Sequence, residues 1–161
     1  WYKKDAEFDR EIGARFGKAH AEAMSGNFDH WSETADGCLA LIILLDQFSR
    51  NLFRDDARAF AADPKALGLT KAALEKGFVD KDTKEQAQFL LMPLMHSENL
   101  ADQDMSIPLF HRFCGEKVAD FATRHRDIIA RFNRFPHRNT ALSRESTPDE
   151  TEFLKTDGSS F

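Results

Sequence analysis

Cysteine and long apolar runs are both scarce in this chain of 161 residues, and each scarcity argues against a class of protein. The two cysteines, Cys38 and Cys114, lie in apolar helical context and form no CxxC pair. A disulfide framework is therefore disfavoured, and a reducing compartment such as the cytoplasm fits better. The longest apolar run, Cys38–Leu45, is far shorter than the roughly 20 residues of a membrane-spanning helix. We expect a cytoplasmic protein with no membrane partner.

Familiar catalytic motifs are absent as well. The sequence contains no GxSxG, GxGxxG, GxxxxGK[ST] or HExxH pattern. His96 and Glu98 are two positions apart, as are His125 and Asp127, and on a helix this spacing points the two side chains away from each other. A metal site could be assembled only across helices, from His96, Glu98, His125 and His137. We predict no metal and no cofactor, and leave open whether the chain is an enzyme.

Charge is unevenly distributed along the chain. The formal net charge is −5, which argues against a nucleic-acid partner. The stretch 124–144 nevertheless holds six arginines, no lysine and one acid, Asp127, so its formal charge is +5 and that of the rest is −10. Arginine without lysine is typical of sites that bind carboxylates or phosphates through planar, bidentate contacts. Salt bridges to the surplus acids are the alternative use of these arginines.

Apolar residues recur at helical spacing along most of the chain, and no strand or hairpin pattern is convincing. The run Leu39–Leu45 is apolar on every side, so its helix should be central. We predict an all-α fold, with one domain over residues 1–161 and antiparallel helix pairs. Further residues are expected upstream, because the chain begins at Trp1 rather than Met. The first predicted helix lies between Asp5 and Gly26, and the second at about 37–51. The third runs from the cap Asp63 to Gly77, and a last helix follows the capping box at Thr147. The three helices between them are predicted at about 83–95, 101–114 and 116–132.

Three polar clusters do not follow from helix packing alone. Asp46 to Asn51 ends the most apolar helix, His96 to Asn99 follows the other apolar helix, and the third cluster is the arginine-rich stretch 124–144. Because two buried helices each end in acids, amides and a charge or an imidazole, we predict that these ends converge on a binding site. The alternatives are structural. Asp46 and Arg50 could simply pair as i, i+4 neighbours, and His96 could be a hydrogen-bonded core histidine.

The irregular segment 134–146 is where we place the ligand contacts of the third cluster. Phe135 precedes a proline and is expected to anchor this segment to the core. That would leave His137, Arg138 and Asn139 free to face a ligand. The predicted ligand-binding residues are Asp46, Arg50, Asn51, His96, Glu98, Arg134, His137, Arg138, Asn139 and Arg144.

The same strings carry a resemblance to a known family. The segments 44–51 (LLDQFSRN), 93–98 (PLMHSE) with Asp102 and Gln103, 131–139 (RFNRFPHRN) and 144–148 (RESTP) resemble the family DUF924, as do Trp31, Phe60-Ala61 with Asp63, and Phe161. The resemblance covers essentially the whole chain. It implies a tetratricopeptide-like helical fold and no assigned activity. It also implies an aromatic segment upstream of Trp1-Tyr2, and a glycine where this chain has Asn133.

Two hypotheses of function follow. The leading one is a binding module, in which helix pairs form an Arg-, His-, Asp- and Glu-lined groove for an acidic peptide or a small anionic molecule. The alternative is an enzyme that acts on a small anionic substrate. In that case Glu98 or His96 would be the general base, and Arg134 and Arg138 would hold the charged group. A shallow groove with solvated arginines would favour the peptide, and a closed site with a desolvated histidine–acid pair would favour catalysis.

Overall fold

The computed structural model describes residues 5–160, which form helices and loops with no strand. This confirms the all-α prediction. The expectations that involve Trp1, Tyr2 and Phe161 lie outside the described residues. Across residues 5–160, no helix combines the length and apolar character that crossing a bilayer requires. The α-helices are α1 (Ala6–Met24), α2 (Ala35–Ile42), α3 (Ser49–Leu52), α4 (Asp63–Glu75), α5 (Lys84–Met95), α6 (Leu100–Cys114), α7 (Glu116–Phe132) and α8 (Pro148–Phe153).

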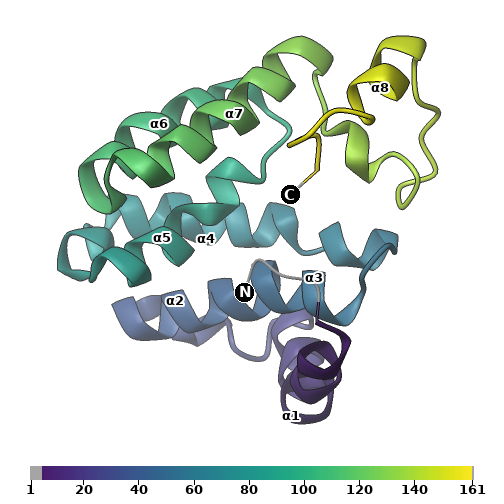
Figure 1. The fold of residues 1–161 in the computed structure, drawn as a ribbon. Coiled ribbons are helices and arrows are strands. Elements are labelled where there is room, and N and C mark those ends of the chain that lie inside the picture. Colours follow the sequence, from purple (N-terminus) through teal and green to yellow (C-terminus); the bar gives the residue numbers. More distant parts are fainter. Residues whose placement is uncertain (1–4, 161) are drawn as a thin grey trace.

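The helices are stacked in order along the chain (Figure 1). The α6 and α7 helices lie on one side, α4 and α5 in the middle, and α2, α3 and α1 on the other side. The segment after α7, which contains α8, lies at one end of this stack. Short 3-10 helices occupy several of the connections: η1 (Asp29–Glu33), η3 (Ala57–Phe60), η4 (Phe78–Lys81) and η5 (Pro136–Arg138).

Most of the predicted helix ends are confirmed by their caps. The Asp5 carboxylate accepts the N–H groups of Glu7 and Phe8, and complete capping boxes open α5 at Thr83 and α8 at Thr147. The prediction that Asp63 caps α4 is wrong. Asp63 is the first residue inside that helix, and no side chain caps it. Its carboxylate is instead directed to two arginines, as described below.

The apolar run in the middle of the chain does not form one regular α-helix over 37–51. It begins as α2 and continues through a π-helix, η2 (Ile43–Phe48), into α3. The expectation that this run is central is correct, because Leu41, Ile42 and Leu45 are fully buried. The π-helical turn contains Asp46 and Gln47, both of which are buried as well. Single π-helical turns occur frequently at functional sites, so this irregularity draws attention to Asp46.

Two apolar clusters form the interior on either side of the central run. One gathers side chains of α2, α5, α6 and α7 around Leu90 and Phe110, and the other gathers α1, α2 and η2 around Leu45. Ile43 packs against both clusters. A smaller cluster holds the segment after α7 and includes Ile129 and Phe135. Phe135 is fully buried, which confirms that it anchors this segment to the core.

Candidate functional site

Five charged or imidazole side chains meet in the interior from five places in the chain. We name this group the central cluster: Asp46 of η2, Arg50 of α3, Asp63 at the start of α4, His96 directly after α5, and Arg138 of η5. The ends of the two apolar helices therefore converge, as the sequence predicted. Folding alone does not require such a group, because buried ion pairs are often no more stabilising than apolar residues of similar size.

Asp46 is the innermost member of the central cluster. Its side chain is 1% exposed, and Oδ1 lies 2.7 Å from Nδ1 of His96 and 3.1 Å from Nη1 of Arg50. The other oxygen accepts a hydrogen bond of 2.6 Å from Nε2 of Gln47. Burial alone would raise the pKa of Asp46, but Arg50 and His96 together hold this pKa well below its usual range. Asp46 is therefore an ionised carboxylate that accepts every one of these bonds.

Asp63 joins the two arginines of the central cluster. Arg50 donates to both carboxylate oxygens, at 3.0 and 3.1 Å, in a bidentate pair. Arg138 donates to the second oxygen at 3.3 Å. Arg50 also donates to the backbone carbonyl of Asp46 at 2.8 Å. The i, i+4 pair of Asp46 and Arg50 is thus confirmed, but it is one contact within a wider network.

Arg138 is buried, contrary to the expectation that it faces a ligand in the open. Its guanidinium lies over two phenyl rings, 4.7 Å from the centroid of Phe60 and 4.6 Å from that of Phe135. One nitrogen donates to the backbone carbonyl of His96 at 3.0 Å, while the buried Nε has no acceptor among the described residues. Burial and the nearby charge of Arg50 lower the pKa of Arg138 to about 10.

Glu98 and Arg144 form a separate pair beside the central cluster. Arg144 donates to both oxygens of Glu98, at 2.7 and 3.0 Å, and the backbone N–H of Phe135 donates to the same carboxylate at 2.8 Å. Burial would raise the pKa of Glu98, but Arg144 and this N–H lower it. Nε of Arg144 is buried without an acceptor in the described part of the chain. Glu98 is therefore the partner of Arg144 and not of His96.

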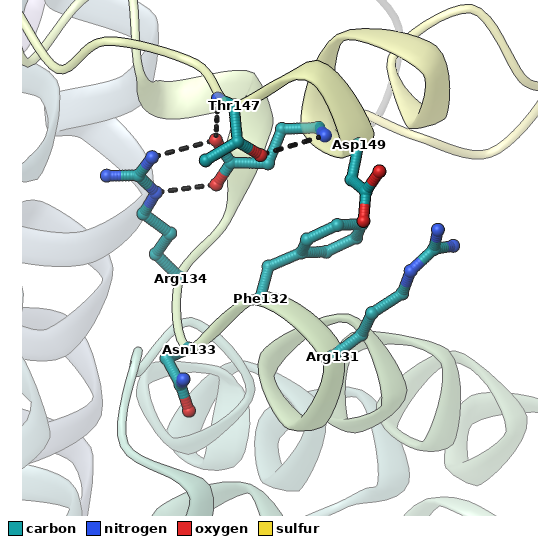
Figure 2. A pocket seen from close by; sticks show the side chains of 7 residues that line it. Arg131, Phe132, Asn133, Arg134, Thr147 and Asp149 are labelled. Carbon is teal, nitrogen blue, oxygen red and sulfur yellow. Dashed lines mark hydrogen bonds and ion pairs between the residues drawn. The ribbon is translucent and has the colours of Figure 1, made fainter.

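Arg134 and Asn139 belong to a second group, which we name the C-terminal clasp, together with Thr147 and Glu150. The Glu150 carboxylate accepts hydrogen bonds from all three other members. Arg134 donates to it at 2.6 and 2.7 Å, the backbone N–H of Thr147 donates at 2.8 Å, and Nδ2 of Asn139 donates at 3.3 Å. The bonds of Arg134 and Thr147 are drawn in Figure 2. The hydrogen bonds from Arg134 lower the pKa of Glu150 to about 2. Asn139 is buried, so the expectation that it points freely at a ligand is wrong.

A cavity of about 510 Å³ lies beside the C-terminal clasp, where α7 ends. In Figure 2 the side chains of Phe132 and Arg131 extend from the end of α7 toward Asp149. Asn133 adopts the left-handed conformation at the end of α7, with φ of 57°, which asparagine tolerates better than most residues. The lining residues are Arg131, Phe132, Asn133, Arg134, Thr147, Asp149 and Glu150.

Two predicted residues lie elsewhere. Asn51 donates to Asp9 of α1 at 2.8 Å, and Arg54 pairs with the same carboxylate, so Asn51 ties α3 to α1. His137 lies half-buried beside the central cluster, where burial and the charge of Arg138 lower its pKa to about 4. Within residues 5–160, no group of three histidine, cysteine or acidic side chains is arranged to hold a metal ion.

Two members of this region, Asp63 and His125, are not among the predicted ligand-binding residues, and His125 was considered only as a metal ligand. Asp63 was interpreted as a helix cap, and its place in the family resemblance was the signal that could have identified it. His125 of α7 is buried, and its Nδ1–H donates a hydrogen bond of 2.7 Å to the backbone carbonyl of Phe121. Its ring packs edge-on against Phe135. Burial lowers its pKa to about 3. A lone histidine on an amphipathic helix carries no sequence signal for such a role.

Comparison with known proteins agrees with the resemblance. A solved structure described as a protein of unknown function from Agrobacterium tumefaciens is 40% identical, with a TM-score of 0.92 over 96% of this chain and 88% of that one. No curated protein matches the sequence. Residues 1–158 match the family described as bacterial protein of unknown function, DUF924. This match covers nearly the whole chain, and the chain therefore belongs to the DUF924 family.

Proposed function

We propose that the protein binds a small anionic molecule at the outer side of the central cluster. The observation that carries this proposal is the buried Nε of Arg138, a charged N–H group without an acceptor among the described residues. Leaving such a donor unbonded in the interior is unfavourable. A carboxylate or phosphate oxygen would supply the acceptor, and these are the groups that arginine recognises best.

The exposed fractions of the side chains indicate where a ligand would enter. Arg138 is 7% exposed, whereas Arg50 is 21%, Asp63 18% and His96 16% exposed. Part of each of these three side chains therefore reaches solvent, whereas Arg138 is almost fully covered. Such limited exposure favours a small molecule over an acidic peptide, because a peptide needs an extended surface to contact.

Isothermal titration calorimetry with inorganic phosphate and with succinate tests this proposal. We expect the unaltered protein to bind at least one of them, and Arg50→Gln to weaken that binding at least tenfold, because it removes a partly exposed guanidinium. The matched control is Arg58→Gln, which removes an exposed arginine paired with Asp56 and should leave binding unchanged. Absence of binding to both anions contradicts the proposal, and binding of a hexaglutamate peptide alone would shift it to the acidic peptide.

The tetratricopeptide-like array and the cytoplasmic location are also proposals. The array is supported by the single residue, Gly115, between α6 and α7, since helices joined so closely usually pack antiparallel. The location is supported by the free thiols of Cys38 and Cys114. Helix-crossing angles in an experimental structure would test the first proposal, and cell fractionation the second.

A further inference from the structure

The bond between Asp46 and His96 fixes which nitrogen of the imidazole carries a proton. Nδ1 of His96 lies 2.7 Å from Oδ1 of Asp46. An ionised carboxylate only accepts hydrogen bonds, so Nδ1 must be the donor. In a neutral imidazole the other nitrogen, Nε2, then has a lone pair and no proton. Among residues 5–160, Nε2 of His96 has no hydrogen-bond partner.

His96 is held in place from two directions. Its ring is fixed by Asp46, and its backbone carbonyl accepts a hydrogen bond from Arg138. The residue directly follows α5, whose last turns are buried. The ring is 16% exposed, so it is not sealed in the interior. A rigid imidazole with an open, unprotonated nitrogen beside two arginines is the arrangement that proton abstraction from an anionic ligand needs.

Asp46 is supported in the same way. It lies in the π-helical turn η2, and Gln47 and Arg50 bond its remaining acceptor sites. An apolar residue would pack into this helix more simply than an ionised carboxylate does. Glu98 is poorly suited to be the base, because Arg144 and the N–H of Phe135 occupy both of its oxygens.

We infer that Asp46 and His96 form a general-base pair, in which Nε2 of His96 removes a proton from a water molecule held beside the bound anion. This inference rests on the proposed anion site. The proton passes to Nε2, and the electron pair of the broken O–H bond stays on oxygen, which attacks an acyl carbon of the ligand. The leaving group departs with its bonding electrons and takes the proton from His96. Asp46 is a positioning residue, since it orients the ring and stabilises the imidazolium.

Several titratable or charged groups surround the His96 ring and set its protonation. Burial, followed by the charge of Arg50, lowers the pKa of His96, so the neutral form that can accept a proton prevails at pH 7. The activity should therefore rise with pH through a pKa below that of free histidine and then level off. The groups that act on His96 from the neighbouring elements are Asp46, Arg50, Asp63, His125, His137 and Arg138.

Hydrolysis of two activated esters tests the inference. Mono-p-nitrophenyl succinate carries a carboxylate, whereas p-nitrophenyl acetate is neutral, and both release p-nitrophenolate. The rate in buffer is subtracted for each ester, because the carboxylate of the succinate ester attacks its own ester carbonyl and speeds the spontaneous reaction. After this subtraction, we expect the unaltered protein to hydrolyse the succinate ester faster than the acetate ester. His96→Gln should lower that rate at least about tenfold, a modest value for general-base catalysis. His111→Gln is the matched control, because His111 is exposed on α6 and should leave the rate unchanged.

The role of Asp46 needs a readout that a purely structural residue would not change. In Asp46→Asn the amide can donate to Nδ1, which would move the proton of His96 to Nε2 and remove the base. Nitrogen-15 NMR of the histidine rings should show this change of tautomer, together with loss of ester hydrolysis, in a variant that melts cooperatively. Loss of hydrolysis in Asp46→Asn with the tautomer unchanged would overturn the positioning role.

The two proposals fail in different ways. If phosphate or succinate binds but neither ester is hydrolysed faster than in buffer, the general base is wrong and the anion site stands. If the acetate ester is hydrolysed through His96 with no preference for the succinate ester, and neither anion binds, the anion site is wrong. Equal rates for the unaltered protein and His96→Gln on both esters would overturn the inference.

Discussion

The central cluster and the C-terminal clasp use the same chemistry to different ends. In the clasp, the carboxylate of Glu150 is 2% exposed and accepts hydrogen bonds from Arg134, Thr147 and Asn139. Nearly every polar group of the clasp that these bonds involve therefore has a partner. Only Oδ1 of Asn139 lacks a donor there among the described residues. In the central cluster, by contrast, Nε of Arg138 and Nε2 of His96 have no partner in that same part of the chain.

This difference separates a structural group from a candidate site. A carboxylate whose acceptor sites are filled has no capacity left for a ligand, and its contribution is to hold α8 against the end of α7. An open donor on Arg138 and an open acceptor on His96, whose backbone carbonyl Arg138 binds, leave capacity for a further molecule. The arginines of the stretch 124–144 therefore have both uses that the sequence left open. Arg134 and Arg144 pair with Glu150 and Glu98, although Nε of Arg144 also lacks an acceptor among the described residues. Arg138 belongs to the proposed site.

The largest expected effect is the loss of protein stability when the central cluster is disrupted. Arg138→Ala removes the guanidinium that packs over Phe60 and Phe135 and leaves Asp63 with one arginine instead of two. We expect the free energy of unfolding to fall by about 3–5 kcal/mol, as for other broken buried ion pairs. Urea unfolding measures this change. A loss below about 1 kcal/mol would show that Arg138 is not embedded as described.

Glu150→Gln tests the structural role of the C-terminal clasp. The substitution keeps the shape but removes the charge that Arg134 binds, so we expect a loss of about 1–3 kcal/mol, the range for hydrogen bonds to charged groups. Because the pKa of Glu150 falls from an ordinary 4.5 to about 2 in the folded protein, its stabilisation is complete above pH 4.5 and declines towards pH 2. Unfolding between pH 2 and 5 should therefore be less pH-dependent in Glu150→Gln. An identical pH dependence would contradict this assignment.

The sequence predicted the helices and the meeting of Asp46, Arg50 and His96, because capping residues and apolar periodicity are local signals. It could not predict the π-helical turn, since the shift of the hydrogen-bond pattern depends on how Leu44 and Leu45 pack against other helices. The burial of Arg138 could not be predicted from the sequence either. It depends on Phe60, which is far away in the chain and entered the sequence analysis only through the family resemblance, with no indication of a contact to Arg138.

A double-mutant cycle tests how far the central cluster extends. Arg50 and Asp63 share two hydrogen bonds, so their substitution by Gln and Asn should show a coupling energy of about 0.5–3 kcal/mol. For Arg50 and Glu98, no hydrogen bond or ion pair joins the two among residues 5–160, and the coupling should stay below about 0.5 kcal/mol. A larger coupling between Arg50 and Glu98 would mean that the central cluster and the Glu98–Arg144 pair act as one unit.

The smallest expected effect is that of a chelator. His96, His125 and His137 act on one another electrostatically, which suggests a metal site, but two hydrogen bonds and the burial of the three rings argue against one. Nδ1 of His96 is bonded to Asp46, and Nδ1 of His125 to the carbonyl of Phe121. The pKa of each of the three imidazoles is lowered mainly by burial, which requires no metal charge. Thermal melting with and without EDTA should give the same midpoint. A structural metal would contribute several kcal/mol to folding, so a clear drop in the midpoint would show that these histidines bind a metal after all.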